Sequence, residues 1–159
     1  MTKTQFAGVQ LSPARRRRVL FDCRRQLTEW GMKMPRVEPL ILDFGLGQFS
    51  KTGLTEFWLA NETEAGYCGK FLFVFDGQTC PYHRHKIKHE IFFAVKGVTK
   101  MKVSGKTRIL KPGDTLVMPI GVGHSFQGMG PALLLEASQP CLPGDSFFRD
   151  RRIGENGVI

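Results

Sequence analysis

Hydrophobic and polar positions follow two different periods along the chain, which indicates two structural regions. Between residues 13 and 30, apolar residues recur every three or four positions, as they do on one face of an α-helix. Ser12 and Pro13 are typical of a helix start, and Gly31 is typical of a C-terminal cap. These signals predict one amphipathic helix over residues 13–30.

After Pro39, the pattern changes to short apolar runs that are separated by Gly, Pro, Asn and Asp. Runs such as "KFLFVF", "HEIFFAVKG" and "ALLLEAS" are rich in β-branched and aromatic residues, which is typical of strands. The segment "VSGK", residues 103–106, fits a tight hairpin turn with Gly105 at positive φ. We therefore expect a single all-β domain, built as an antiparallel sandwich or barrel. Residues 1–38 would form a helical arm, residues 39–140 the barrel, and residues 141–159 a tail that closes its pocket.

Length and composition narrow the class of protein. A chain of 159 residues is long enough to bury the core of one domain. It has no apolar run long enough for a bilayer and no apolar centre of a signal peptide, so we expect a cytoplasmic protein that binds no membrane. The four cysteines show no paired spacing, which predicts reduced thiols rather than a disulfide framework or a cysteine zinc site.

The net charge of +9 raises the question of nucleic acid, because six arginines lie within the predicted helix. No nucleic-acid motif surrounds them, and no aromatic residues interleave with them. We interpret the arginines as the solvated face of the helix and expect no nucleic-acid partner, with a nucleic-acid arm as the alternative.

Three histidines and one glutamate form the strongest chemical signal. His83 and His85 alternate along one predicted strand, so their imidazoles point to the same face. Glu90 brings a carboxylate to the mouth of an apolar strand, and His124 follows the turn-forming segment "PIGVG". This donor set predicts one divalent transition-metal ion with two positions left open for oxygen atoms of a substrate. The alternative is a metal-free barrel with ordinary core or surface histidines, and we expect His89 to be a supporting or surface residue.

The spacing of these residues resembles both signature motifs of the cupin superfamily. The first reads Gly77, five residues, His83-x-His85, four residues, Glu90, six residues and a glycine; the second reads Gly, five residues, Pro-x-Gly, two residues and His124. Gly128 stands where the second motif often has Asn. The resemblance implies a double-stranded β-helix, or jelly-roll barrel, with His83, His85, Glu90 and His124 as metal ligands.

Three further segments are similar to parts of the cupin-type D-lyxose isomerases: "DFGLGQFSKTGL", "YCGKFLFVFDGQTCPYHRH" and "FFRDRRIG". This resemblance implies a homodimer that interconverts an aldose and a ketose on a divalent metal, with manganese expected first and zinc, iron, cobalt and nickel as alternatives. It also implies that Lys70 and Glu136 are catalytic and that Asp150 and Arg152 bind the sugar. From the sequence pattern alone, Lys70 and Glu136 could equally well be functional residues or charges that face solvent.

The expected reaction follows from these assignments. The metal would bind the C1 and C2 oxygens of an open-chain sugar such as D-lyxose or D-xylulose, and Glu136 would move a proton through a cis-enediol. Lys70 would stabilise the oxyanion or shuttle the hydroxyl proton. Two alternatives stay open: a metal-dependent cupin oxygenase, and a non-catalytic sugar-binding cupin. The second is kept open because the segment between the motifs is shorter than in the best-known family members.

Overall fold

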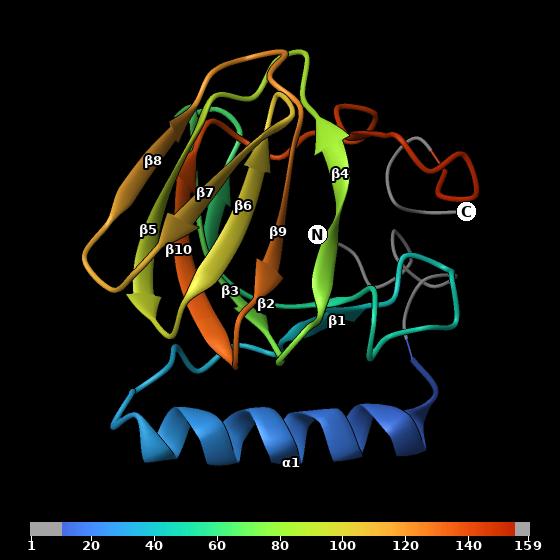
Figure 1. The fold of residues 1–159 in the computed structure, drawn as a ribbon, viewed down its shortest axis with the longest axis vertical. Coiled ribbons are helices and arrows are strands. Elements are labelled where there is room, and N and C mark those ends of the chain that lie inside the picture. The colour runs from blue at the N-terminus through green and yellow to red at the C-terminus, as the bar shows by residue number, and fades with distance from the viewer. Residues whose placement is uncertain (1–10, 155–159) are drawn as a thin grey trace.

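Two antiparallel sheets face each other, and one helix lies outside them (Figure 1). The structure, a computed structural model, describes residues 11–154. One sheet has the strand order β1-β2-β3-β10-β5-β8, and the other has the order β11-β4-β9-β6-β7. The predicted all-β cupin fold with an N-terminal helix is confirmed.

The helix and strands have the following bounds. They are α1 (Pro13–Glu29), β1 (Leu40–Leu42), β2 (Leu54–Glu62), β3 (Tyr67–Val74), β4 (Thr79–Arg84), β5 (Glu90–Lys96), β6 (Thr99–Val103), β7 (Lys106–Leu110), β8 (Thr115–Met118), β9 (His124–Gly128), β10 (Ala132–Ser138) and β11 (Phe147–Phe148). The predicted hairpin turn joins β6 to β7, with Ser104 at φ 47° and Gly105 at φ 80°. Positive φ at both central residues is the geometry that suits the twist of a two-residue hairpin.

Helix α1 covers the outer face of the six-stranded sheet. Its buried residues Cys23 and Leu27 pack against Phe57, Phe73 and Leu133 of three neighbouring strands. The arginines on the opposite face of the helix are mostly exposed, as expected for a solvated face. No helix in residues 11–154 is both long enough and apolar enough to cross a membrane.

The two ends of α1 lie where the sequence predicts them but are stabilised differently. At the C-terminal end, Gly31 has φ 65° and the Met32 N–H donates to the Leu27 carbonyl at 2.9 Å. This is the capping geometry that a glycine favours. At the N-terminal end, Ser12 is the N-cap and the helix begins at Pro13, as predicted, although the Ser12 side chain makes no capping hydrogen bond. Ser12 contributes its carbonyl instead, which accepts from the Arg16 N–H at 2.8 Å.

The space between the sheets is apolar at one end and polar at the other. Side chains two positions apart on a strand point to the same face, so Leu72 and Lys70 both point inward on β3, as do Leu134 and Glu136 on β10. The strand register places Glu136 directly beside Lys70. The same interior therefore passes from a hydrophobic core to a group of buried charges.

Candidate metal centre and active site

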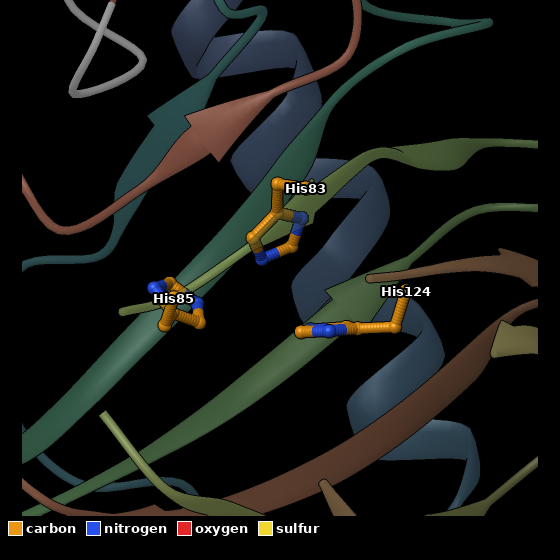
Figure 2. A group of neighbouring side chains, drawn as sticks. All are labelled: His83, His85 and His124. Carbon is orange, nitrogen blue, oxygen red and sulfur yellow. The ribbon is translucent and has the colours of Figure 1, made fainter. Parts of the chain in front are cut away.

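Three histidine side chains meet at the polar end of the interior (Figure 2). His83 on β4 and His124 on β9 pair in register, and His85 follows directly after β4. One nitrogen from each ring lies within 4.8 Å of the other two. The structure thus brings together the three imidazoles that the sequence predicted to converge.

Each of the three imidazoles has its Nδ1 atom hydrogen-bonded to a backbone carbonyl. The acceptors of His83, His85 and His124 are the carbonyls of Pro81 at 2.7 Å, Asp145 at 2.8 Å and Val122 at 3.2 Å. A carbonyl can only accept, so Nδ1 carries the hydrogen and Nε2 presents a lone pair. Such outer contacts orient histidines that ligate metals.

Glu90 adds a carboxylate beside these lone pairs. Its Oε1 lies 3.5 Å from His85 Nε2, and its Oε2 lies 3.3 Å from His124 Nε2. Glu90 Oε2 and both Nε2 atoms are buried and have no hydrogen-bond partner. Buried polar atoms normally have partners, and a cation would supply one here. The residues therefore fit a divalent metal ion.

The three imidazoles are neutral at physiological pH. Burial lowers the pKa of His83 well below its usual range, with His124 and His85 adding to the effect. Burial likewise lowers the pKa of His85 to about 3 and that of His124 to about 4. Neutral imidazole is the form that binds a metal, so the site does not need to lose protons from its histidines.

We expect the metal-free protein to lose stability as pH falls below about 6.5, the pKa of an unperturbed histidine. Below that value, the unfolded chain binds protons that the folded histidines do not accept, so stability present above pH 6.5 is progressively lost. Urea unfolding in the presence of a chelator at pH 7, 6 and 5 measures the slope of the free energy of unfolding against pH. His124→Gln should make the slope shallower by about one proton, whereas His89→Gln, at an exposed residue, should not. Equal slopes in the parent and His124→Gln would contradict the assignment.

A row of five buried ionisable side chains, here called the charge row, extends from the histidines across the six-stranded sheet. Carboxylates and ammonium groups alternate along it: Glu90 to Lys88 at 2.6 Å, Lys88 to Glu136 at 3.0 Å, Glu136 to Lys70 at 3.4 Å and Lys70 to Glu56 at 3.4 Å. All five side chains are buried. Buried charges are tolerated only when they are paired, and each interior member of this row has an opposite charge on both sides.

Two carboxyl groups of this row, Glu136 at its centre and Glu90 at its end, have opposite pKa shifts. Burial would raise the pKa of Glu136, but the ammonium groups of Lys70 and Lys88 lower it far below its usual range. Burial, with the nearby charge of Glu136, raises the pKa of Glu90 to about 8 despite Lys88. Glu136 is therefore ionised at neutral pH. Glu90 is the carboxyl that a metal ion would deprotonate on binding.

A cavity of about 220 Å³ opens beside the histidines and the charge row. Apolar and aromatic side chains, including Leu42, Phe44, Leu54 and Trp58, line much of the remaining wall. The C-terminal segment contributes Cys141, Leu142, Pro143, Ser146 and Phe148. A small, mostly apolar cleft with a few convergent polar groups is typical of a small-molecule site.

Sequence reasoning missed two residues that organise this site. Lys88 links Glu90 to Glu136, although it lies in a polar turn and resembles an ordinary surface lysine. Asp145 accepts backbone N–H groups of Lys86, Ile87 and Lys88 at 2.8, 3.0 and 2.9 Å. It fixes the turn that carries Lys88, yet in "PGDS" it reads as a turn residue and gives no functional signal.

The structure does not bring Asp150 and Arg152 to the cavity. Their side chains pair with each other at 2.6 Å and are 33% and 70% exposed. Neither lines the cavity beside the histidines. Their predicted role in sugar binding stays a prediction. His89 is exposed, in agreement with its expected place outside the ligand set.

Comparisons with known proteins agree with this architecture. A family model for the cupin domain matches residues 71–138, and a family model for D-lyxose isomerase matches residues 39–94. The D-lyxose ketol-isomerase of Cohnella laeviribosi is 29% identical over 148 residues, which cover 75% of this chain and 80% of that protein. The D-lyxose/D-mannose isomerase of Thermosediminibacter oceani is 49% identical over 45 residues, 28% of this chain and 24% of that protein.

A solved structure with the same fold is an L-ribose isomerase mutant from Acinetobacter sp. in complex with L-ribose. It aligns with a TM-score of 0.78 and 14% identity, and covers 96% of this chain and 98% of that chain. The fold is that of a cupin, and the three histidines lie in the segment that the cupin family model matches. Within the cupins, it resembles the cupin-type D-lyxose isomerase family, as the sequence predicted.

Proposed function

We propose that the protein is a metal-dependent aldose–ketose isomerase that acts on a small, unphosphorylated sugar such as D-lyxose. The observation that carries the proposal is the buried Glu136 carboxylate, which lies between two ammonium groups on the wall of the same cavity as His83 and His85. The relatives named above are isomerases of lyxose, mannose and ribose, which supports the reaction class.

His83, His85, His124 and Glu90 are the proposed ligands of one divalent ion, for which manganese is our first expectation. When bound, the ion would polarise the carbonyl group of an open-chain sugar. Mixed nitrogen and oxygen donors suit manganese, iron, cobalt, nickel and zinc, so the donor set favours this group of metals over calcium or magnesium.

Glu136 is the proposed base that moves a proton between C1 and C2 of the sugar. It is ionised, buried and lines the cavity, which are the requirements for accepting a proton from carbon. Lys70 and Lys88 touch Glu136 from either side and stay charged, since neighbouring anions raise both lysine pKa values despite burial. The same ammonium groups would stabilise the negative charge of the enediolate.

The row of buried charges favours catalysis over simple sugar binding. Hydroxyl groups can be recognised by neutral donors and acceptors, which need less desolvation than ions. Burying five ionisable groups in one wall is costly, and strongly shifted pKa values in a cleft are typical of catalytic sites.

The cavity suits a neutral ligand rather than a sugar phosphate. Each ammonium group in its lining, those of Lys70 and Lys88, already lies between two carboxylates. No arginine is found among the described residues that line the cavity. A phosphate group would meet the three carboxylates without an available guanidinium or ammonium partner.

The decisive experiment is a panel of free aldopentoses and aldohexoses, each paired with its phosphate ester, on protein that has been stripped of metal and reloaded with Mn²⁺. We expect ketose formation from at least one free sugar, no turnover without metal, and turnover of the matching phosphate at least about a hundredfold slower, the effect of roughly 3 kcal/mol of unfavourable burial. Ketose formation is measured by nuclear magnetic resonance.

Other outcomes of the panel would contradict the proposal. Thermal stabilisation by sugars with no turnover would indicate a sugar-binding cupin, and oxygen uptake by the iron-loaded protein would indicate an oxygenase. Faster turnover of the phosphate ester would overturn the substrate class alone. The predicted homodimer and cytoplasmic location stay predictions.

A further inference from the structure

Two cysteine sulfurs approach each other at the edge of the cavity. Cys68 lies on β3, Cys141 follows β10, and their Sγ atoms are 3.8 Å apart. The two positions are 73 residues apart in sequence, which is why their spacing gave no signal. A disulfide bond has an S–S length of about 2.0 Å, so the sulfurs must approach by about 1.8 Å for the bond to form.

Asn61 holds the backbone on both sides of this contact. It pairs in register with Cys68 across β2 and β3. Its side chain also receives the Cys141 N–H at 2.8 Å and donates to the Cys141 carbonyl at 3.0 Å. The two cysteines are therefore kept opposite each other by one residue, and their approach does not depend on a mobile loop.

The environment of Cys141 favours its reactive form. Lys88 Nζ donates to its sulfur at 3.5 Å. The hydrogen bond from Cys68, together with the charges of Lys70 and Lys88, lowers the pKa of the Cys141 thiol to about 6 against the opposing effect of burial. Cys141 also lines the cavity, which gives small oxidants a path to it.

The other cysteines provide a contrast within the same molecule. Cys80 also lines the cavity, but burial raises its pKa well above the usual range. Burial raises the pKa of Cys23 to about 12, and its side chain is fully buried between α1 and the six-stranded sheet. Both are expected to remain protonated and unreactive.

We propose that Cys68 and Cys141 are a hydroperoxide-reactive pair that closes to a reversible disulfide in the wall of the cavity. The Cys141 thiolate attacks a peroxide oxygen, which breaks the O–O bond, forms a sulfenic acid and releases hydroxide or alcohol. The Cys68 sulfur then attacks the sulfenic sulfur, which forms the S–S bond and releases water, the two thiol protons ending in the products. The peroxide is reduced by two electrons, and the two thiols are oxidised.

This bond would act on the site through Lys88. The Cys141 sulfur would move toward Cys68 and lose its negative charge, so Lys88 would lose one of its three anionic contacts. Because Lys88 also contacts Glu90 and Glu136, its position in the charge row would change. The disulfide itself does not depend on the proposed isomerase function, whereas its effect on turnover does.

The experiment treats the full reduced chain with one equivalent of hydrogen peroxide and measures the intact mass and the disulfide-linked peptides. We expect the mass to fall by two hydrogen atoms, a single Cys68–Cys141 linked peptide, and full reversal by dithiothreitol. Cys68→Ser should instead accumulate a sulfenic acid that dimedone traps at Cys141. Cys80→Ser, the matched control in the same cavity, should form the linked peptide like the parent.

An unchanged mass after peroxide would overturn the proposal, and so would a link between other cysteines or a dimedone adduct in Cys68→Ser at a residue other than Cys141.

Sugar turnover by the oxidised protein should fall about tenfold, the effect of one hydrogen bond to a charged group, and recover on reduction. A linked protein with unchanged turnover would limit the pair to a modification site without control over catalysis. If neither redox form turns over sugar, the failure lies with the isomerase proposal, and the mass and linkage results decide the disulfide.

Discussion

Replacement of Glu136 by glutamine is expected to lower kcat of the metal-loaded enzyme about a thousandfold, the usual contribution of a general base. Glutamine preserves the shape of the side chain but cannot accept the proton from the sugar. The Ser138 hydroxyl, which lies 3.0 Å from Glu136 Oε1, can still donate to the amide oxygen. The loss should therefore appear in kcat more than in KM.

The measurement compares initial rates of ketose formation for the parent, Glu136→Gln and Glu62→Gln, all with metal content verified. Glu62 lies at the exposed end of β2, so the same substitution there tests for effects unrelated to the site. Glu136 is not among the proposed metal ligands, and the variant should keep its metal. A folded, metal-loaded Glu136→Gln variant as active as the parent would remove Glu136 from the mechanism.

Replacement of Lys88 by methionine should lower the free energy of unfolding of the metal-free protein by about 3 to 5 kcal/mol, the effect of leaving a buried charge without its partner. Lys88 Nζ contacts Glu90 at 2.6 Å and Glu136 at 3.0 Å. Without it, the ionised Glu136 keeps only Lys70 as an ammonium partner, and Glu90 loses the ammonium group that contacts it. Saturating metal should restore part of the loss, because the ion would supply the positive charge that Glu90 needs.

Urea unfolding at pH 7, with and without metal, measures this effect. Lys86→Met is the matched control, because Lys86 lies two residues away and is exposed, with its Nζ over the Phe147 ring at 4.3 Å. Its substitution should change the free energy of unfolding by less than about 1 kcal/mol. Equal destabilisation by the two variants would show that the charge row is not what stabilises this region.

The histidines of the site were predictable because their signal is contained in local spacing and strand alternation. His83 and His85 share a face by the period of two, and the turn before His124 requires glycine and proline at fixed places. The helix was equally predictable, since its apolar period ends at Gly31. In each case, a local rule of backbone geometry left a readable pattern in the sequence.

The lysines and carboxylates of the charge row were harder to assign because their partners lie on other strands. Glu56, Lys70 and Glu136 come from β2, β3 and β10, and only the sheet order reveals that they are neighbours. A charged residue in an alternating strand points to solvent in most proteins, so the pattern alone supports the ordinary interpretation. Lys88 was hard to assign for the same reason, because it lies in a turn and one of its partners, Glu136, lies far away in the sequence.

Asp150 and Arg152 illustrate the opposite limitation. Their assignment rested on family resemblance alone, with no local rule to support it. In the structure they lie two residues apart and satisfy each other, so neither needs a partner in the cavity. Family resemblance therefore remains the support for their predicted role in sugar binding.

The position of Asp145 has a consequence for when the protein can acquire its ion. Asp145 orients His85 through its carbonyl and holds the turn that carries Lys88, yet it comes later in the chain than all four proposed ligands. During synthesis from the N-terminus, the four ligands emerge before the residue that aligns His85. A nascent chain would therefore display its imidazoles in an unaligned state, and selective loading should begin only once the segment after β10 has left the ribosome and folded back.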